Sequence, residues 1–256
     1  MSGAPNTLFV GQTILRLERI HSTNQYMVDM VREATLPEGL VVVAREQTAG
    51  RGQRGTHWES VAGKNLTFSL FLRPNFLKPD QQFYLSKAVA LSLTSVVQRH
   101  VEGAVRLKWP NDVLVNGRKI AGILIENQHR GNEWSSVVGI GLNVNQRLFN
   151  TINSATSLAA QSGESFDLEA LLHELCQQLE AGYMQLRQRA NALDERYLHL
   201  LHGLGERWCF ETDDGPLWGK IVGVSVLGKL QVQNDAGIIR EFGLKEIVFP
   251  SNDITS

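Results

Sequence analysis

One stretch of the sequence, Arg45–Trp58, has the residue types and spacing to hold an anion. Its centre, residues 50–55, reads G-R-G-Q-R-G and places Arg51 and Arg54 among three glycines. Glycine lets the backbone approach a ligand closely, and arginine supplies fixed donors for carboxylate or phosphate. Residues 40–44 are apolar and of strand length, which predicts a strand that delivers a mobile anion-binding loop. The alternative is a solvated turn with surface arginines, which two further stretches disfavour.

Residues 105–126 carry two lysines in a predicted hairpin. Strand alternation separates Lys108 from the apolar residues of its strand, and Asn116-Gly117 is a pair that two-residue hairpin turns favour. Lys119, on the second strand, shares a face with small and branched apolar residues. Its spacing alone fits an anion-binding role and an edge-strand role that discourages aggregation equally well.

Two polar residues, Asn111 and Asp112, follow Lys108 after a proline that ends the strand. Their oxygens are suited to pair with that lysine, or to orient a metal ion and a phosphate. The sequence leaves both interpretations open.

Hydroxyl and amide side chains also gather between a predicted strand at 13–20 and the helix that follows it. Ser22, Thr23 and Asn24 are residue types preferred at helix N-caps, so capping alone explains them. The functional interpretation is that a helix N-terminus here presents polar groups to a carboxylate or a ureido-type group.

The strand predicted at 137–145 has one unusually smooth face. Gly139, Gly141, Asn143 and Asn145 share that face, which predicts a floor for a flat ligand with amides at one end. A glycine-weakened strand that admits a neighbouring backbone is the alternative. It is disfavoured because two amides would then need partners if they were buried.

Around these stretches the sequence predicts a mixed core followed by a small barrel. Apolar periodicity predicts a strand and three helices in the core, at 66–72, 80–101, 168–189 and 191–201. Near residue 206 the pattern changes to five short strands separated by turns, which is typical of a small β-barrel. We therefore predict a larger domain at 1–205 and a barrel domain at 206–256.

Composition excludes several function classes. The 256 residues carry a formal net charge of −1 and are 43% hydrophobic, which is typical of a globular protein with a full core. A nucleic-acid binder would normally show a basic excess. The two cysteines form no metal-ligand spacing or disulfide framework, and no apolar run has the length of a membrane span. We expect a cytoplasmic protein with no membrane or nucleic-acid partner.

Taken together, these residues resemble the catalytic core of biotin–protein ligases. The family patterns G-R-G-R-R-G-x-x-W, K-W-P-N-D and K-x-x-G-I-L are similar to residues 50–58, 108–112 and 119–124. The S-T-N, G-I-G-x-N and A-T-S-L features resemble residues 22–24, 139–143 and 155–158. The combination is specific, and with the small barrel the resemblance covers nearly the whole chain.

The resemblance implies an α+β fold. A mixed sheet of the class II aminoacyl-tRNA synthetase type, flanked by helices, would precede a small C-terminal Src-homology-3-like β-barrel. It implies a ligase that uses Mg²⁺-ATP to convert biotin into biotinyl-5′-AMP and then attaches biotin to a lysine of a biotin carboxyl carrier protein. No tightly bound cofactor is expected, and a homodimer is compatible with the family. A lipoate or octanoate ligase of the same core is the alternative.

The resemblance also implies roles for single residues. The catalytic set is Lys108, Asp112, Lys119 and Arg51. The set that contacts biotin or the adenylate is Ser22, Thr23, Asn24, Gln47, Arg51, Gly52, Gln53, Lys119, Gly122 and Asn143. No residue is assigned to a metal. Gln53 departs from the arginine common in the family, so we expect looser retention of the adenylate. Only about a dozen residues precede the first predicted strand, so we expect no DNA-binding repressor activity.

Overall fold

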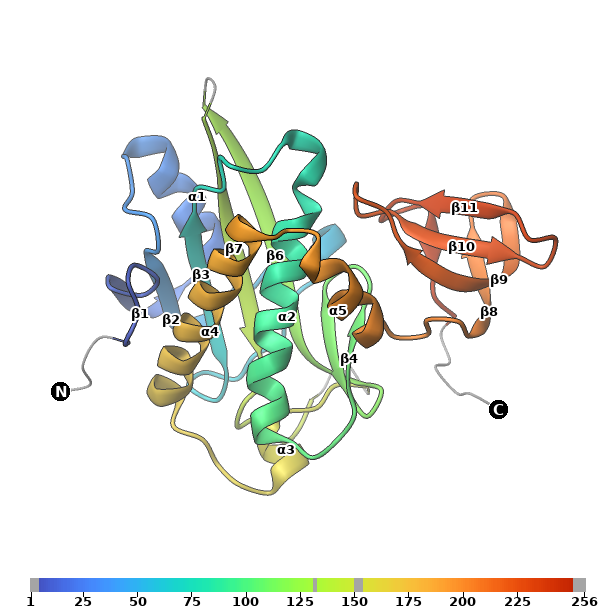
Figure 1. Cartoon of the computed structure of the whole chain (residues 1–256). Helices are drawn as coiled ribbons and strands as arrows, with labels where there is room; N and C mark the ends of the chain where they lie inside the picture. Colours follow the sequence, from blue (N-terminus) through green and yellow to red (C-terminus); the bar gives the residue numbers. More distant parts are fainter. Residues whose placement is uncertain (1–4, 131–132, 150–153, 251–256) are drawn as a thin grey trace.

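A seven-stranded mixed sheet forms the centre of the larger part of the molecule (Figure 1). The computed structural model describes residues 5–130, 133–149 and 154–250. The strand order is β1-β2-β3-β7-β6-β5-β4, in which β1 and β2 pair in parallel and all other neighbours are antiparallel. The strands are β1 (Ile14–Ile20), β2 (Val41–Gln47), β3 (Leu66–Leu72), β4 (Val105–Lys108), β5 (Asp112–Val115), β6 (Arg118–Arg130) and β7 (Glu133–Leu142).

Helices cover both faces of this sheet. They are α1 (Thr23–Glu33), α2 (Phe83–His100), α3 (Leu158–Ser162), α4 (Leu168–Gln188) and α5 (Ala192–Leu200), with 3-10 turns η1 (Gln53–Gly55) and η2 (Pro79–Gln81). Val41 and Leu70 pack into the large apolar cluster with α2 and α4, whereas their neighbours Val42 and Phe71 pack with α1. Alternate strand residues point to opposite faces, so α1 lies across the sheet from α2 and α4.

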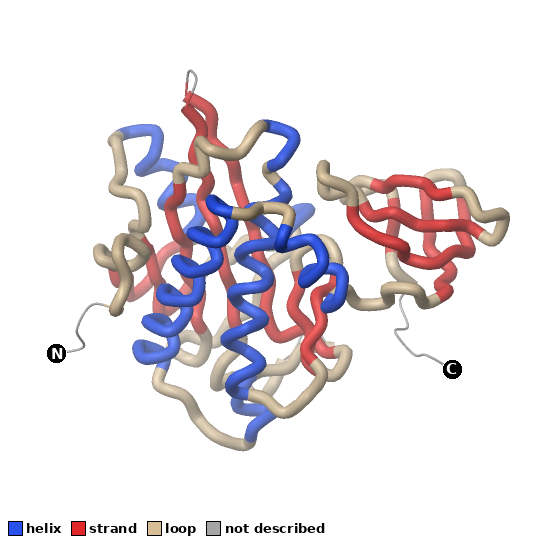
Figure 2. The backbone as a smooth tube through the Cα atoms, in the orientation of Figure 1, coloured by secondary structure: helices blue, strands red, loops and turns tan. Residues whose placement is uncertain are grey.

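A second, smaller antiparallel sheet follows α5 (Figure 2). Its order is β11-β10-β9-β8-β12, formed by β8 (Arg207–Thr212), β9 (Gly215–Val224), β10 (Leu230–Asn234), β11 (Ile239–Phe242) and β12 (Ile247–Val248). The predicted α+β fold with a small C-terminal β domain is therefore confirmed. The boundary between residues 205 and 206 stays a prediction.

The two sheets meet beside the strand ends that carry the predicted site. The Nε1 of Trp109, just after β4, donates to the backbone oxygen of Gly228 in the barrel at 2.9 Å. Gly228 has a φ of +81° and lies so close to Phe83 of α2 that an added Cβ would come within 2.6 Å of the ring Cγ. A side chain at Gly228 would push the barrel away from the core.

A buried carboxylate anchors the segment before β1. Glu180 of α4 is 8% exposed and accepts hydrogen bonds from the backbone N–H groups of Leu8, Phe9 and Val10 at 2.7, 2.8 and 3.0 Å. Bonds to an ionised acceptor are stronger than neutral ones, so this segment is held firmly on α4. None of the described helices has the length and apolar composition needed to cross a bilayer.

Candidate active site

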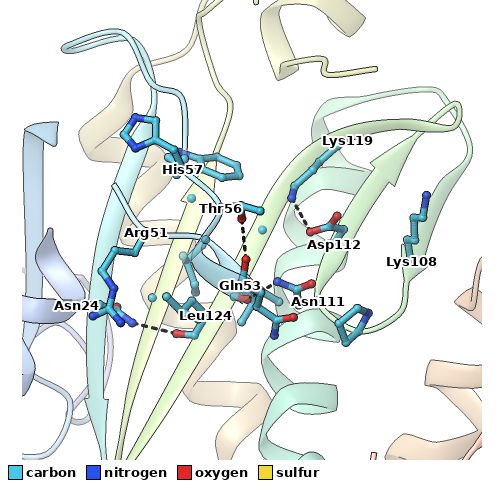
Figure 3. Close-up of a pocket in the computed structure, with 18 of the residues that line it drawn as sticks. Asn24, Arg51, Gln53, Thr56, His57, Lys108, Asn111, Asp112, Lys119 and Leu124 are labelled. Carbon is cyan, nitrogen blue, oxygen red and sulfur yellow. Dashed lines mark hydrogen bonds and ion pairs between the residues drawn. The ribbon is translucent and has the colours of Figure 1, made fainter. Parts of the chain in front are cut away.

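A cavity of about 430 Å³ lies where α1, the β6–β7 hairpin and the Gly/Arg loop converge. All the residues to which the resemblance assigns a catalytic or ligand-contacting role, except Asn143, line it: Ser22, Thr23, Asn24, Gln47, Arg51, Gly52, Gln53, Lys108, Asp112, Lys119 and Gly122. These residues come from four separate stretches of the chain, and the fold brings them to one place (Figure 3). The side chain of Arg54, also predicted to bind an anion, lies outside what the structure describes.

The Gly/Arg loop, residues 50–58, is ordered by its own hydrogen bonds. The N–H of Gly52 donates to the oxygen of Thr56 at 2.7 Å, and the N–H of Trp58 donates to the oxygen of Gly50 at 2.9 Å. The Thr56 hydroxyl donates to the oxygen of Gln53 at 2.7 Å. Gly55 has a φ of +78°, a conformation that favours glycine. These bonds give the loop a defined shape, and residues 51–53 and 56–58 of it line the cavity.

The cavity floor is formed by glycines of β6 and β7. Gly122 pairs with Gly141, and Leu124 pairs with Gly139. An added Cβ would lie 2.6 Å from Cζ2 of Trp58 at Gly141, and 2.7 Å from Cγ of Asn24 at Gly139. The predicted smooth floor is present, but its glycines make room for two side chains rather than for a neighbouring backbone.

The amide end predicted for this floor is wrong, because β7 ends at Leu142 and the next residues turn away from the cavity. Asn143 donates through Nδ2 to the oxygen of Thr156 at 3.0 Å, and Asn145 bonds to the backbone of Phe166 through both ends of its amide. The assignment of Asn143 to the nucleotide stays a prediction that this geometry does not favour.

One wall of the cavity is polar and mostly uncharged. The Ser22 hydroxyl caps α1 by accepting from the N–H of Gln25. The Oε1 of Gln47 accepts from the N–H of Thr23 at 2.7 Å and lies 3.1 Å from its hydroxyl. Asn24 donates to the oxygen of Leu124 at 3.1 Å. Capping and site formation therefore both apply to this segment: Ser22 does the first, and all three residues line the cavity.

The opposite end of the cavity is charged. Lys119 Nζ is 2.7 Å from Asp112 Oδ1 and 5.6 Å from the centre of the Trp58 ring. Strand β6 lies between β5 and β7, so the edge-strand interpretation of Lys119 is wrong. Lys108 Nζ is 5.1 Å from the centre of the Phe249 ring. Two lysines and one carboxylate thus lie beside the glycine floor, where they can bind anionic groups of a ligand.

Several lining residues were not predicted from the sequence. The last strand of the barrel contributes Ile247 and Val248, the residue after it is Phe249, and the loop contributes His57 and Trp58. Trp58 and His57 lie within the Gly/Arg stretch, so that stretch could have indicated them. The three barrel residues carry no local signal, because they approach the cavity only through tertiary packing.

Metal ligands are a separate question from anion binding. Across residues 5–130, 133–149 and 154–250, no group of three or more His, Cys, Asp or Glu side chains could hold a metal ion. A divalent ion that enters with a nucleotide polyphosphate needs few protein ligands, because the phosphates and water supply most of them.

Comparisons with known proteins show what the chain as a whole is similar to. A family model described as the Biotin/lipoate A/B protein ligase family matches residues 17–143. The bifunctional ligase/repressor BirA of Bacillus subtilis is 34% identical over 245 residues, which cover 91% of this chain and 73% of that protein. A biotin–[acetyl-CoA-carboxylase] ligase of Mycobacterium tuberculosis is 28% identical over 236 residues, covering 91% and 85%.

Solved structures of biotin protein ligases are also similar to this chain. The biotin protein ligase of Aquifex aeolicus in complex with biotin and ATP superimposes with a TM-score of 0.78 at 26% identity, covering 93% of this chain and 99% of that one. The Leishmania major biotin protein ligase in complex with biotinyl-5-AMP has a TM-score of 0.61 at 25% identity, covering 91% and 99%.

Proposed function

Because the chain belongs to the biotin/lipoate A/B protein ligase family, we propose that it catalyses ATP-dependent attachment of biotin to a lysine of a protein through biotinyl-5′-AMP. The observation that supports this most is a single cavity that joins an uncharged polar wall to a cationic end across a glycine floor. Biotin has the same polarity: a neutral ureido group at one end and a carboxylate at the other.

The polar wall suits the ureido end of biotin. Thr23, Asn24 and Gln47 offer hydroxyl and amide groups that can donate to a ureido oxygen and accept from its N–H groups. They carry no net charge, so a neutral ligand can enter without leaving a buried charge unpaired. The relatives of this chain that are named biotin–[acetyl-CoA-carboxylase] ligases support biotin, rather than lipoate, as its substrate. Lipoate has no ureido group, so it could not use the donor and acceptor positions of these side chains that remain open to a ligand.

The cationic end suits the first chemical step. A biotin carboxylate oxygen attacks the α-phosphorus of MgATP, a new P–O bond forms, and the bond to the β-phosphate breaks with pyrophosphate as the leaving group. Both reactants are anions, so the step needs cations that hold them together. Lys119 and Lys108 supply that charge at this end in this proposal. The guanidinium of Arg51 lies beside Asn24, where it pairs with Glu126 and Gln25, and its catalytic role stays a prediction. Asp112, 2.7 Å from Lys119, fixes the position of the ammonium group.

In the second step, the amine of an acceptor lysine attacks the carbonyl carbon of the adenylate. The amide bond forms, the bond to AMP breaks, and the amine releases its proton. Water would hydrolyse the adenylate, so the loop at 50–58 must keep solvent out while the acceptor enters. We propose a biotin carboxyl carrier protein as the acceptor, Mg²⁺ as the counter-ion of ATP, and the cytoplasm as the compartment.

The test is ATP–pyrophosphate exchange with biotin, with lipoate and with neither. We expect exchange that requires biotin, and a loss of at least about 100-fold in Lys119→Ala, because this variant removes a cation from the transition state. Lys78→Ala, which changes an exposed lysine at the start of η2, is the matched control and should keep full activity. Exchange with lipoate instead of biotin would assign the chain to the lipoate branch of the family.

Two expectations from the sequence, a possible homodimer and the lack of operator binding, remain predictions. A homodimer can be tested by sedimentation of the protein with and without biotin and ATP. The expected lack of operator binding can be tested by a gel-shift assay with the DNA upstream of the chain's own gene, in the presence of biotin and ATP.

A further inference from the structure

Glu126 of β6 joins the Gly/Arg loop to the polar wall, although it is not among the residues that line the cavity. Its Oε1 is 3.1 Å from Nη2 of Arg51, and its Oε2 accepts from Nδ2 of Asn24 at 3.0 Å. The Glu126 side chain is 23% exposed, so solvent screens these contacts only in part. One carboxylate thus holds a loop cation and a wall amide at the same time.

The other end of the Asn24 amide is fixed by Ser69 of β3. Ser69 is fully buried, and its hydroxyl donates to Oδ1 of Asn24 at 2.6 Å. Both Nδ2 hydrogens of Asn24 are used, one by the oxygen of Leu124 and one by Glu126. An amide can usually be turned over with little change in shape. Here the partners on each side determine which end is the oxygen.

These bonds form a directed chain that begins at Glu126. An ionised carboxylate only accepts hydrogen bonds, so Asn24 must turn its NH₂ group toward it and its oxygen toward Ser69. The single hydroxyl hydrogen of Ser69 then goes to Asn24. The Thr23 hydroxyl, 2.8 Å from Ser69 Oγ and 3.1 Å from Gln47 Oε1, donates to one of these two acceptors. The Leu124 carbonyl and the Glu126 carboxylate, which both accept from Asn24, therefore together set which end of this amide donates and which accepts.

Arg51 depends on the same carboxylate. Its guanidinium bonds to Glu126 and, through Nη1, to Oε1 of Gln25 at 2.9 Å. Figure 3 shows Arg51 extending from the loop toward Asn24. The arginine side chain is 44% exposed. Among the side chains that the structure describes, the neutral amide of Gln25 is the partner that would remain to it without Glu126.

We propose that Glu126 is a positioning residue for ligation. With the Leu124 carbonyl it fixes the hydrogen-bond polarity of Asn24 and Ser69 in the cavity wall, and through Arg51 it holds the Gly/Arg loop at the cavity. This inference rests on the proposed function for the identity of the ligand. A ureido group has an acceptor between two donors, so it needs a wall whose donor and acceptor pattern does not fluctuate.

The test compares Glu126→Gln, which keeps the shape and removes the charge, with Glu18→Gln. Glu18 pairs with Arg45 on the exposed surface of β1 and β2, and it is 74% exposed. The readouts are the KM values for biotin and ATP and kcat in ATP–pyrophosphate exchange, the rate of adenylate release, and Tm. For Glu126→Gln we expect the KM for biotin to rise about tenfold, as when a charged hydrogen-bond partner is lost, with the KM for ATP changed less than about twofold.

Two further variants test the two arms separately. Ser69→Ala should raise the KM for biotin without speeding adenylate release, because it acts on Asn24 and not on Arg51. In an Arg51→Ala background, Glu126→Gln should raise the KM for biotin but should not accelerate adenylate release any further. A structural role alone would lower Tm and kcat in all variants and leave the ratio of the two KM values unchanged.

Hydrogen–deuterium exchange of the ligand-free protein gives a readout that needs no activity. The N–H groups of Gly52 and Trp58 are bonded within the loop, and in Glu126→Gln they should exchange at least about tenfold faster than in the parent. Equal protection, with an unchanged KM for biotin, would overturn the inference while leaving the proposed function intact. If the parent uses lipoate rather than biotin, the proposed function fails, and loop protection still decides whether Glu126 positions the loop.

Discussion

Gly141→Ala tests how closely the cavity is packed around Trp58. The added Cβ would lie 2.6 Å from Cζ2 of the indole, whereas carbon atoms pack at about 3.5–4.0 Å. The ring must therefore shift by about 1 Å. On one side it contacts Gly122, where an added Cβ would lie 3.1 Å from Cζ3, and Lys119 Nζ is 5.6 Å from the ring centre. The ring therefore cannot move without changing the cationic end of the cavity.

The expected magnitude follows from overpacking, which costs about 1–3 kcal/mol in a well-packed site. If that cost falls on the bound state, the KM for biotin rises by about 5- to 150-fold. The assay is biotin-dependent ATP–pyrophosphate exchange over a range of biotin concentrations, with Tm measured in parallel. Gly223→Ala in the barrel is the control, because its Cβ meets only the flexible end of the Gln231 side chain.

A second substitution, at Trp58, tests whether the indole ring causes the expected penalty. Trp58→Leu replaces the indole with a smaller side chain. In this background Gly141→Ala should therefore not raise the KM for biotin any further. A change of less than about twofold in this KM for Gly141→Ala alone would show that the indole does not pack closely on the floor. An equally large penalty with and without the indole would show that the ring is not what the added methyl group displaces.

Three further outcomes are expected. Gln53→Arg should slow adenylate release by about tenfold, because a charged donor replaces a neutral one; equal release rates in the two proteins would contradict this. Glu180→Gln should lower stability by about 3 kcal/mol, or about 6–12 °C in Tm, because the charged acceptor of three backbone N–H groups is lost. The KM for biotin should not change, and a Tm within 2 °C of the parent, measured calorimetrically, would argue against the anchor. Burial raises the pKa of the Cys176 thiol from 9.0 to about 12, so its contribution to stability is present below pH 9 and is lost between pH 9 and 12. Between pH 8 and pH 10.5, Cys176→Ala should lose about 2 kcal/mol less stability in urea unfolding than the parent. The buried Tyr183 and Tyr197, whose pKa values burial also raises, contribute equally in both proteins.

The sequence was most informative where chemistry requires particular residues close together in the chain. The Gly/Arg loop, the hairpin around Lys119 and the hydroxyls after β1 were each visible as local patterns, and the structure brings them to one cavity. The core helices, several strands and the small barrel were also predictable, because apolar periodicity reports local structure. The mixed sheet was expected only from the family resemblance.

The rest depended on contacts between distant segments. Glu126 and Ser69 meet at Asn24 from three different elements, and neither residue stands out in its own strand. Asn143 illustrates the opposite error: its alternation with Gly139 and Gly141 suggested a common face, but the strand ends one residue earlier, at Leu142. A strand end is set by tertiary hydrogen bonding, which a pattern of residue types does not report.

The position of the last barrel strand also determines when, during synthesis of the chain, the cavity can be completed. The cavity is lined both by Ser22–Asn24 and by Ile247–Phe249, so its two ends are made by parts of the chain that leave the ribosome far apart. The last strand of the large sheet ends at Leu142. Protein synthesis adds about 5–20 residues per second, so Phe249 is synthesised several seconds or more after the strands of that sheet. During that interval the cavity lacks one wall. A nascent chain would be unable to shelter a reactive intermediate, and only a finished chain would acquire the enclosed site.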